Sequence, residues 1–358
     1  MRLALKPGLV PVWRDSDTLQ IGIDPRRAVA VSGAGHAGAL IGLLDGSRDR
    51  AAMIAAAGEH GIGPGEADHL ITLLAAAGVL DDFPAGALRA VADRVRSRLA
   101  PELATTSLAH GDGDGGARSL ARRAAAYVRV HGAGKVGSTV ATLLASSGIG
   151  HVTCRDTAAA VAADLTPGGL GEADIGTPRE SGVARAIGRT APQVRTDDDG
   201  GRPDLAVLTG QHGPELAGAL TSGGVPHLTA TAGEAIGVVG PLVLPGRSAC
   251  LRCLNMTRAD ADPQWPLVLA QLTGCQPATP ACDCALATSV AALACAQVLT
   301  FVDRCGKASA VTNGTLELVL PGWQWRRRTW LPHPACGCRA ATPAHSQVER
   351  STRGDGEC

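Results

Sequence analysis

The sequence has few aromatic residues, no net charge and no evident membrane segment. Its 358 residues include five Trp, two Phe and one Tyr, and Lys plus Arg equal Asp plus Glu at 33 each. A neutral chain without an arginine-dense helix argues against a nucleic-acid partner. No apolar run reaches the roughly 18 residues that span a bilayer, and the N-terminus lacks a signal-peptide core. We therefore expect a cytoplasmic protein that binds neither nucleic acid nor membrane.

Cysteine, in contrast, is plentiful. An odd total of 11 in a long chain without a secretion signal favours reduced thiols and a metal site over a disulfide framework. Two close pairs stand out, Cys250 with Cys253 and Cys336 with Cys338. Together they supply four thiolates, which fill the tetrahedral shell of Zn²⁺ and leave no open position, as in a structural site. The alternative is four unligated thiols.

The pattern of apolar residues divides the chain into four parts. Residues 1–82 contain two strand-like runs, "TLQIGID" and "RAVAVSG", and three short helical patterns, which predicts a small winged-helix-like α+β module. Residues 83–125 are predicted to be a helical and Gly/Asp-rich linker. In residues 126–338 strand-like and helical runs alternate, which predicts an α/β domain with a mainly parallel, Rossmann-like sheet. Residues 339–358 are predicted to be disordered.

A glycine-rich turn follows the first strand of the α/β part. Gly132, Gly134 and Gly137 form a G-x-G-x-x-G between a strand and a helix, and Asp156 ends the next strand. Such glycines allow the backbone to approach a phosphate, and the acid can bind a ribose hydroxyl. The same glycines also permit a tight turn in a fold that binds no nucleotide. Lys135 lies inside the motif and could contact a phosphate.

The amino-acid sequence of this region resembles that of the ThiF/MoeB/ubiquitin-activating (E1-like) family. "GAGKVGSTVATLLASSGIGHVTCRD" is similar to the opening of that UBA/THIF-type fold, and "DIGTPRESGVARAIGRTAP" places Arg179 where the family has a phosphate-contacting lysine. "GVVGPLVLPGRSACLRCL" resembles the strands that deliver the first two zinc ligands, although the second cysteine pair is CxC and not CxxC. The resemblance covers residues 126–338 and implies an ATP-binding, zinc-stapled domain.

Several residues that the family uses to adenylate a carboxylate are replaced. The second acid is Ala158, the following loop contains neither Asn nor Arg, and the Mg²⁺-holding aspartate falls on Gln211. A neutral amide is a poorer Mg²⁺ ligand than a carboxylate, and arginine lacks the compact ammonium of lysine. We therefore expect that adenylation is lost, which leaves no assigned catalytic residue and makes ATP binding uncertain from the sequence.

The first part of the chain resembles the PqqD-like leader-recognition element. In azole- and azoline-forming (TOMM) clusters this element is fused to a ThiF-like domain, which implies binding of a precursor or leader peptide and presentation to a cyclodehydratase-type or other maturation enzyme. A hairpin edge beside a helix can accept such a peptide as an added strand. Four arginines could meet an acidic leader: Arg14, Arg26, Arg27 and Arg48.

Three alternatives remain at this stage. The first is an active ThiF/MoeB-type adenylyltransferase, which would act on a carboxylate of a small protein or peptide. The second is a first module that serves only packing or dimerisation, and the E1-like resemblance itself allows a homodimer. The third is a nicotinamide-linked oxidoreductase, which is disfavoured because no hydride-transfer site is recognisable and the cysteine pairs would have no role.

Overall fold

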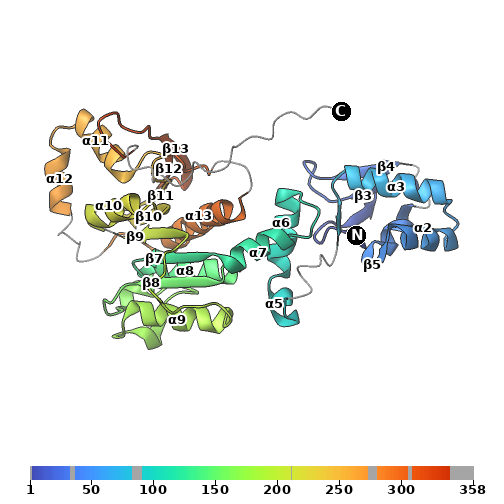
Figure 1. Ribbon diagram of the computed structural model, residues 1–358, viewed down its shortest axis with the longest axis horizontal. Coiled ribbons are helices and arrows are strands. Elements are labelled where there is room, and N and C mark those ends of the chain that lie inside the picture. Colours follow the sequence, from blue (N-terminus) through green and yellow to red (C-terminus); the bar gives the residue numbers. More distant parts are fainter. Residues whose placement is uncertain are drawn as a thin grey trace, which may run out of the picture. The chain divides into compact units, whose positions relative to one another are not determined.

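The computed structural model describes residues 2–32, 37–82, 91–210, 212–272, 280–304 and 309–338. The chain divides into two compact units, Met1–Ala124 and Ala125–Cys358 (Figure 1). The predicted disordered tail, 339–358, and Gln211 lie outside the described residues.

The first unit contains two three-stranded antiparallel sheets and helices that pack on them. One sheet has the order β5-β1-β6 and the other β2-β3-β4. The strands are β1 (Arg2–Leu5), β2 (Pro11–Trp13), β3 (Thr18–Ile21), β4 (Val29–Ser32), β5 (Asp45–Asp49) and β6 (Leu80–Asp82). The three helices expected from the sequence are α1 (Ala37–Leu43), α2 (Arg50–Glu59) and α3 (Pro64–Ala76).

The two strands expected from the sequence are β3 and β4, and the other four were missed. They span only three to five residues, and β5 reads "DGSRD", which shows no alternation of apolar and polar residues. Their position is set by pairing with distant strands, as when Leu3 of β1 pairs with Asp82 of β6.

The outer edges of the β2-β3-β4 sheet differ in their capacity to bind another strand. Backbone bonds from Gly22 N to Val10 O and from Arg14 N to Thr18 O fix which residues of β2 face β3. Along an antiparallel pair, successive residues direct their backbone N–H and C=O groups alternately toward the partner strand and away from it. Pro11 therefore directs its backbone toward the outer edge of the sheet, where it has no N–H to donate.

By the same alternation, Ala30 and Ser32 of β4 direct their N–H and C=O groups away from β3. Both residues are exposed, and among the described residues no strand pairs with this side of β4. The β4 edge can therefore form a backbone ladder with an added strand, whereas the proline weakens the β2 edge.

The stretch predicted to be a linker is largely helical in its described part. It forms α5 (Asp93–Arg98), α6 (Ala100–His110) and α7 (Ala117–Ala125). Leu99, Leu103, Ala117 and Leu120 build a small core between them. Gly116 has φ +82°, and a Cβ there would lie 2.8 Å from Leu103 O, so glycine permits the turn before α7 to approach α6.

A buried polar cluster fastens α6 to the sheet β5-β1-β6. Lys6 follows β1 and is 3% exposed, and Asp81 of β6 is fully buried. Lys6 Nζ donates to Ser107 O of α6 at 2.9 Å and lies 3.8 Å from Asp81 Oδ1. The Ser107 hydroxyl donates to Asp81 Oδ2 at 2.6 Å. The cluster satisfies most of its buried polar atoms through contacts across three elements.

The second unit is built on a seven-stranded sheet of order β13-β12-β11-β10-β9-β7-β8 (Figure 1). Neighbours from β8 to β10 are parallel, and those from β10 to β13 are antiparallel. The strands are β7 (Tyr127–His131), β8 (His151–Arg155), β9 (Leu205–Thr209), β10 (His227–Gly233), β11 (Ile236–Val243), β12 (Gly314–Val319) and β13 (Gln324–Thr329). The expected Rossmann-like α/β fold is confirmed, with a mixed sheet whose parallel half carries the glycine motif.

Helices cover the sheet and build its core. α8 (Lys135–Ser146) packs against α9 (Arg179–Thr190), α13 (Cys284–Asp303) and strands β7 and β8. The remaining helices are α10 (Pro214–Ser222), α11 (Leu251–Ala261) and α12 (Trp265–Leu272), and two short 3₁₀ turns, η1 (Ala162–Asp164) and η2 (Glu172–Asp174), precede α9.

In the part of the chain that the structure describes, one helix, α13, is long and apolar enough to cross a membrane by length and composition alone. Its residues Leu286, Val290 and Val298 are nevertheless buried in the core, and the helix packs on β10, β11 and α8. This burial is that of a central core helix, so the helix gives no support to a membrane span.

Replacing Lys6 by Met tests the buried cluster of the first unit. The variant leaves the Asp81 carboxylate buried without its cation, and we expect a loss of about 3–5 kcal/mol of stability. Hydrogen exchange of α6 and β6 in the full chain measures the effect. Arg26→Met removes an exposed pair with Asp24 and is the control, with an expected change below about 1 kcal/mol. Equal exchange in both variants would contradict the assigned role.

Candidate functional site

The glycine turn joins β7, α8 and β9 by close backbone contact. Gly132 has φ +87°, and a Cβ at this position would lie 2.3 Å from Thr209 O. At Gly137 a Cβ would lie 2.0 Å from Gly132 O. The Thr209 hydroxyl donates to His131 O at 3.0 Å and to Gly132 O at 2.9 Å. Two of the three motif glycines are therefore required by packing of the turn itself.

The third motif glycine, Gly134, precedes α8 without a side-chain cap. A Cβ there would meet only Asp164 Oδ1 at 3.6 Å. The first backbone N–H groups of α8 and the positive end of its dipole therefore face the crevice at the carboxyl ends of β7 and β9. This is where a doubly wound sheet binds a phosphate.

Asp156 lies directly beside this turn, at the end of β8. Its Oδ2 accepts from Ala133 N at 2.8 Å, and its Oδ1 accepts from Ala158 N at 3.1 Å. The backbone N–H of Asp156 donates to Glu180 Oε2 at 3.1 Å. The acid predicted to bind ribose thus lies beside the glycine turn and holds it through its own hydrogen bonds, and ribose binding stays a prediction.

Arg179, the first residue of α9, is bound between two carboxylates. Its Nε donates to Asp164 Oδ2 at 2.8 Å, and its Nη1 donates to Asp156 Oδ2 at 3.3 Å. Asp164 is 9% exposed, and its Oδ2 also accepts from Val161 N at 3.0 Å. The charge of the guanidinium is therefore balanced within the chain, and its fork is directed at the loop that follows β8.

Lys135 is likewise engaged within the chain. Its Nζ donates to Cys282 O at 3.2 Å, which ties the first turn of α8 to the segment before α13. Asp283 caps α13 by accepting from Leu286 N at 2.7 Å, and Cys284 is the first residue of that helix. Burial raises the pKa of the Cys282 thiol. Cys282 and Cys284 thus lie at the start of α13, where the Cys282 thiol donates to the backbone carbonyl of Asp283 at 3.8 Å.

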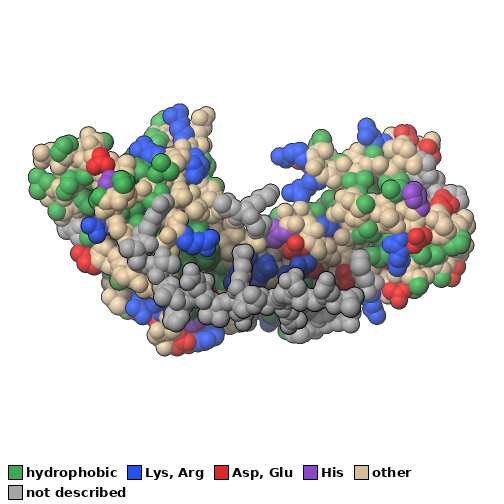
Figure 2. Space-filling view, turned by 45° about the horizontal axis from the view of Figure 1, so that its top comes forward, with side chains coloured by type: hydrophobic (Ala, Val, Ile, Leu, Met, Phe, Trp, Pro, Cys, Tyr) green, Lys and Arg blue, Asp and Glu red, His purple; other side chains and the backbone are tan. Residues whose placement is uncertain are grey.

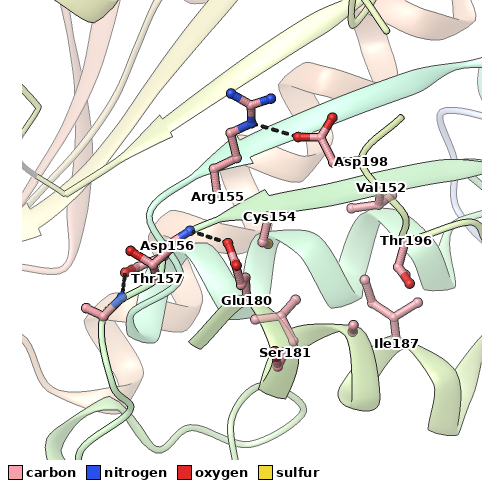
Figure 3. A pocket seen from close by; sticks show the side chains of 13 residues that line it. Val152, Cys154, Arg155, Asp156, Thr157, Glu180, Ser181, Ile187, Thr196 and Asp198 are labelled. Carbon is pink, nitrogen blue, oxygen red and sulfur yellow. Dashed lines mark hydrogen bonds and ion pairs between the residues drawn. The ribbon is translucent and has the colours of Figure 1, made fainter. Parts of the chain in front are cut away.

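A cavity of about 750 Å³ adjoins Asp156 on the side of α9 (Figure 3). Its apolar wall includes Val152, Val183 and Ile187, and Cys154 points into it from β8. Its polar rim consists of Asp156, Thr157, Glu180, Ser181, Thr196, Asp198 and Arg155. The volume and the mixed lining suit a nucleoside-sized ligand.

The rim of this cavity is held by an ion network that the sequence reading overlooked. Asp198 accepts from Arg155 Nε at 2.7 Å (Figure 3), and it also accepts from Arg129 Nη2 at 2.9 Å. These interactions hold the pKa of Asp198 down at about 2, because the hydrogen bond from Arg155 favours the ionised carboxylate. All three aspartates of the run 197–199 are exposed, and Asp198 bonds to the edge of β8 through Arg155.

His131 ends β7 next to the glycine turn and is mostly buried. Burial, helped by the positive fields of His212, Arg129 and Arg155, lowers its pKa from 6.5 to about 4. The folded chain therefore favours the neutral imidazole. The free energy of unfolding therefore has its full contribution from neutral His131 above about pH 6.5, and it falls as the pH is lowered toward 4.

The four predicted metal ligands converge at one point. Cys250 caps α11 and Cys253 lies in its first turn, and the other pair follows β13. Distances between sulfurs are 3.7 Å for Cys250 to Cys253, 3.6 Å for Cys250 to Cys336 and 3.5 Å for Cys253 to Cys338. All four ligand atoms lie within 4.8 Å of one another. These distances are close to the edge of about 3.8 Å that a tetrahedral site with Zn–S bonds of about 2.3 Å requires.

The surroundings of the cysteines fit a structural metal. Cys250, Cys253 and Cys336 are buried with Val243, Leu254 and Trp330 in a core of their own. Burial raises the pKa of the Cys336 thiol to about 11, so a bound cation is needed to hold that sulfur as a thiolate at neutral pH. The four cysteines could hold a metal ion, and the donor set leaves no place for a substrate.

His333 flanks the cysteine cluster without joining it. Its Nε2 pairs with Asp260 Oδ2 at 2.9 Å, and its Nδ1 accepts from Ala335 N at 3.2 Å. The His333 carbonyl accepts from Cys336 N at 3.0 Å. The histidine thereby orients the segment that carries the second cysteine pair.

Comparison with known proteins shows what this geometry is similar to. The model of the ThiF family matches residues 113–200, which include the glycine turn, Asp156 and Arg179. The second unit contains a ThiF-like domain. No curated protein sequence matches the chain.

Solved structures with the same fold extend over nearly the whole chain. E. coli MccB with ATP superposes with a TM-score of 0.68 at 17% identity and covers 94% of this chain and 99% of MccB. Microcin C7 biosynthetic enzyme MccB in complex with N-formylated MccA gives 0.67 at 16% identity, covering 95% and 100%. PaaA gives 0.69 at 14% identity, covering 90% and 98%. At these identities the similarity establishes the fold.

The ThiF-like domain brings together nearly all the residues singled out from the sequence. The three glycines, Lys135, Asp156 and Arg179 line one turn, and the four cysteines form one cluster. Nucleotide binding by the first group remains a prediction. The sequence reading missed Asp164 and Glu180. The available signal for Asp164 was its position as the single acid in the otherwise neutral loop "AAVAADLTPGG", which precedes the basic residue Arg179 at the start of α9.

Replacing Cys253 by Ser tests the metal site of the ThiF-like domain. We expect bound zinc to fall from one ion per chain toward none, and the thermal midpoint to fall with it, because three thiolates and a hydroxyl bind Zn²⁺ poorly. Elemental analysis and thermal unfolding measure both. Cys295→Ser, a buried cysteine in α13 outside the cluster, is the control and retains the metal. A Cys253 variant with full zinc content would refute the site.

Proposed function

We propose that the chain binds a precursor or leader peptide through its first unit and presents it to a maturation enzyme in peptide natural-product biosynthesis. The observation that carries this proposal is the open edge of β4. Its free groups at Ala30 and Ser32 offer backbone hydrogen bonds to an extended peptide, which is the usual basis of strand addition.

Two further features support peptide binding. A protein of the same fold, MccB, is crystallised in complex with MccA. The first unit also resembles the PqqD-like leader-recognition element in its order of hairpin and helices. A cytoplasmic location and a cyclodehydratase-type partner belong to the same proposal, as does a homodimer built through the ThiF-like domain.

The arginines expected to meet an acidic leader differ in availability. Arg26 is paired with Asp24 at 2.6 Å and Arg48 with Asp45 at 3.4 Å. Arg27 donates to Leu108 O. Arg27 keeps its charge because its acceptor is a neutral carbonyl, so Arg14, which follows β2, and Arg27 would supply the electrostatic attraction to a leader, and the backbone ladder would supply most of the affinity.

The proposal includes a ThiF-like domain that no longer adenylates. Both cations expected at the phosphates are bound within the chain, Arg179 by two carboxylates and Lys135 by Cys282 O. Ala158 and Gln211 replace acids of the family pattern. Phosphoryl chemistry depends on cations and Mg²⁺ that neutralise developing charge, and each of these departures weakens that effect.

A second candidate is an active ATP-dependent adenylyltransferase. The cavity beside Asp156 favours it, because about 750 Å³ is enough for a nucleoside next to an intact glycine turn. In that case Arg179 would have to exchange a carboxylate for a phosphate. Structural zinc has the same role in both candidates.

Ala30→Pro tests the docking edge. The substitution removes the outward N–H of β4, while the bonds to β3 come from Val29 and Val31 and remain. Labelled peptides encoded by short genes beside the gene for this chain serve as probes in fluorescence anisotropy with the full chain. We expect about tenfold weaker binding, since one lost hydrogen bond in a ladder costs about 1–1.5 kcal/mol. Ala30→Thr keeps the N–H and is the matched control; unchanged binding by the proline variant would refute the edge.

ATP–pyrophosphate exchange separates the two candidates. The purified chain, with the peptide, ATP and Mg²⁺, is expected to give no exchange above background, while an active ThiF-family adenylyltransferase assayed in parallel gives robust exchange. Exchange that depends on Asp156, as shown by its loss in Asp156→Asn, would establish the adenylyltransferase instead.

A further inference from the structure

Strand β13 forms an edge of the seven-stranded sheet, and in the described part of the chain no strand pairs with its outer side. Trp330, which directly follows β13, donates its N–H to Asn313 O, just before β12, at 2.9 Å. Because successive residues of an antiparallel pair face the partner strand and the open side in turn, this bond fixes the facing of the whole strand. Trp325, Arg327 and Thr329 therefore direct their backbone N–H and C=O groups outward, where another strand can bind.

The middle of this edge is basic. Arg326, Arg327 and Arg328 follow one another along β13, and all three are exposed. Side chains of consecutive residues in a strand point to opposite faces of the sheet, so guanidinium groups lie on both faces of the edge. In the space-filling view, basic side chains gather over the upper part of the second unit, drawn at the left, where β12 and β13 lie (Figure 2).

The charge of these arginines is only partly balanced within the chain. Arg327 Nε donates to the neutral Ala310 O at 2.8 Å, so its positive charge is kept. Arg328 Nε lies 3.3 Å from Glu317 Oε1 of β12. Glu317 is the register partner of Arg326, but its ion pair is with Arg328, and Arg326 forms no ion pair with any other described residue. In these contacts three cations therefore meet one carboxylate.

Exposed apolar side chains flank the basic segment at both ends. Trp323, directly before β13, is 45% exposed. Val319, which pairs with the first residue of β13, is 51% exposed, and Leu331, just beyond the end of the strand, is 71% exposed. A strand added along β13 would be complementary over its whole length if it carried acidic residues in its middle and apolar residues near its ends.

The charge of the edge decides between three possible occupants. A second copy of the chain that paired β13 with β13 would set arginine against arginine, and like charges opposite each other destabilise a strand pair. A nucleic acid could meet the guanidinium groups, but it would leave the outward N–H and C=O groups of the strand without a ladder. An acidic polypeptide in extended conformation satisfies both the charges and the backbone.

We propose that the outer edge of β13 is a docking site for an acidic, extended segment of a partner protein, which joins the sheet as an added strand. The backbone groups of Trp325, Arg327 and Thr329 form the ladder, and the three consecutive arginines select carboxylates on the incoming strand. The exposed apolar side chains at the two ends of β13 cover the ends of the segment. This site lies on the ThiF-like domain and does not depend on peptide binding at β4.

Binding of a short labelled peptide of alternating Glu and Val to the full chain tests this site by fluorescence anisotropy. Arg326→Glu is expected to weaken binding roughly tenfold, because a cross-strand attraction becomes a repulsion. Thr329→Pro removes an outward N–H and is expected to weaken binding by about the same factor. Two matched controls are expected to keep the wild-type affinity. Thr329→Val retains the N–H, and Arg202→Glu makes the same change of charge just before β9, which is four places from β13 in the sheet order.

Two further measurements separate this site from other sites and ligands. Ala30→Pro, which blocks the β4 edge, is expected to leave binding of this peptide unchanged, and a single-stranded oligodeoxynucleotide is expected to bind far more weakly than the peptide. Protection of the α13 amides from hydrogen exchange shows that each variant is folded. The proposal is overturned if the wild type does not bind the peptide, if Arg326→Glu or Thr329→Pro binds it as the wild type does, or if the oligodeoxynucleotide binds equally well. Loss of binding in Ala30→Pro would place the peptide at β4 and overturn it as well.

Discussion

Everything at the centre of the ThiF-like domain depends on the close approach of three backbone segments at the glycine turn. Gly132 and Gly137 have no room for a Cβ, and Thr209 bonds to carbonyls of the turn. This contact aligns β7, β9 and α8 whether or not a ligand is present. Because packing alone requires these glycines, their presence is evidence for the fold more than for nucleotide chemistry, and the function must be argued from the charged residues around them.

Those charged residues form a network that is complete within the chain. Asp156 accepts from the glycine turn, Arg179 links Asp156 to Asp164, and Lys135 reaches Cys282 O. A triphosphate would have to displace bonds that already stabilise the loop after β8 and the start of α13. A nucleoside would displace fewer of these bonds, because the cavity lies on the α9 side of Asp156. Nucleoside binding at this site, if measured, would therefore not by itself imply adenylation.

The sequence predicted those features that local pattern controls, and it missed those that distant contacts control. The parallel strands, the glycine turn and the cysteine pairs follow from periodicity and spacing within short windows. The strands β1, β5 and β6 contain polar residues and exist through pairing across the first unit, as between Arg2 and Asp49. Asp164 and Asp198 likewise acquire their importance only from arginines on other elements. A single sequence does not reveal such pairings.

The zero net charge of the chain now has a structural meaning. In the described ThiF-like domain, the arginines at 129, 155, 179, 185 and 195 each pair with an aspartate on a neighbouring turn or strand. Such pairing uses these five guanidinium groups to hold loops in place, so none of them can contact a polyphosphate or nucleic acid without giving up an existing ion pair. A backbone edge needs no charge to bind an extended chain. The internal pairing of these charges therefore favours the proposed binding of a peptide by its main chain at β4 over stabilisation of a highly charged transition state.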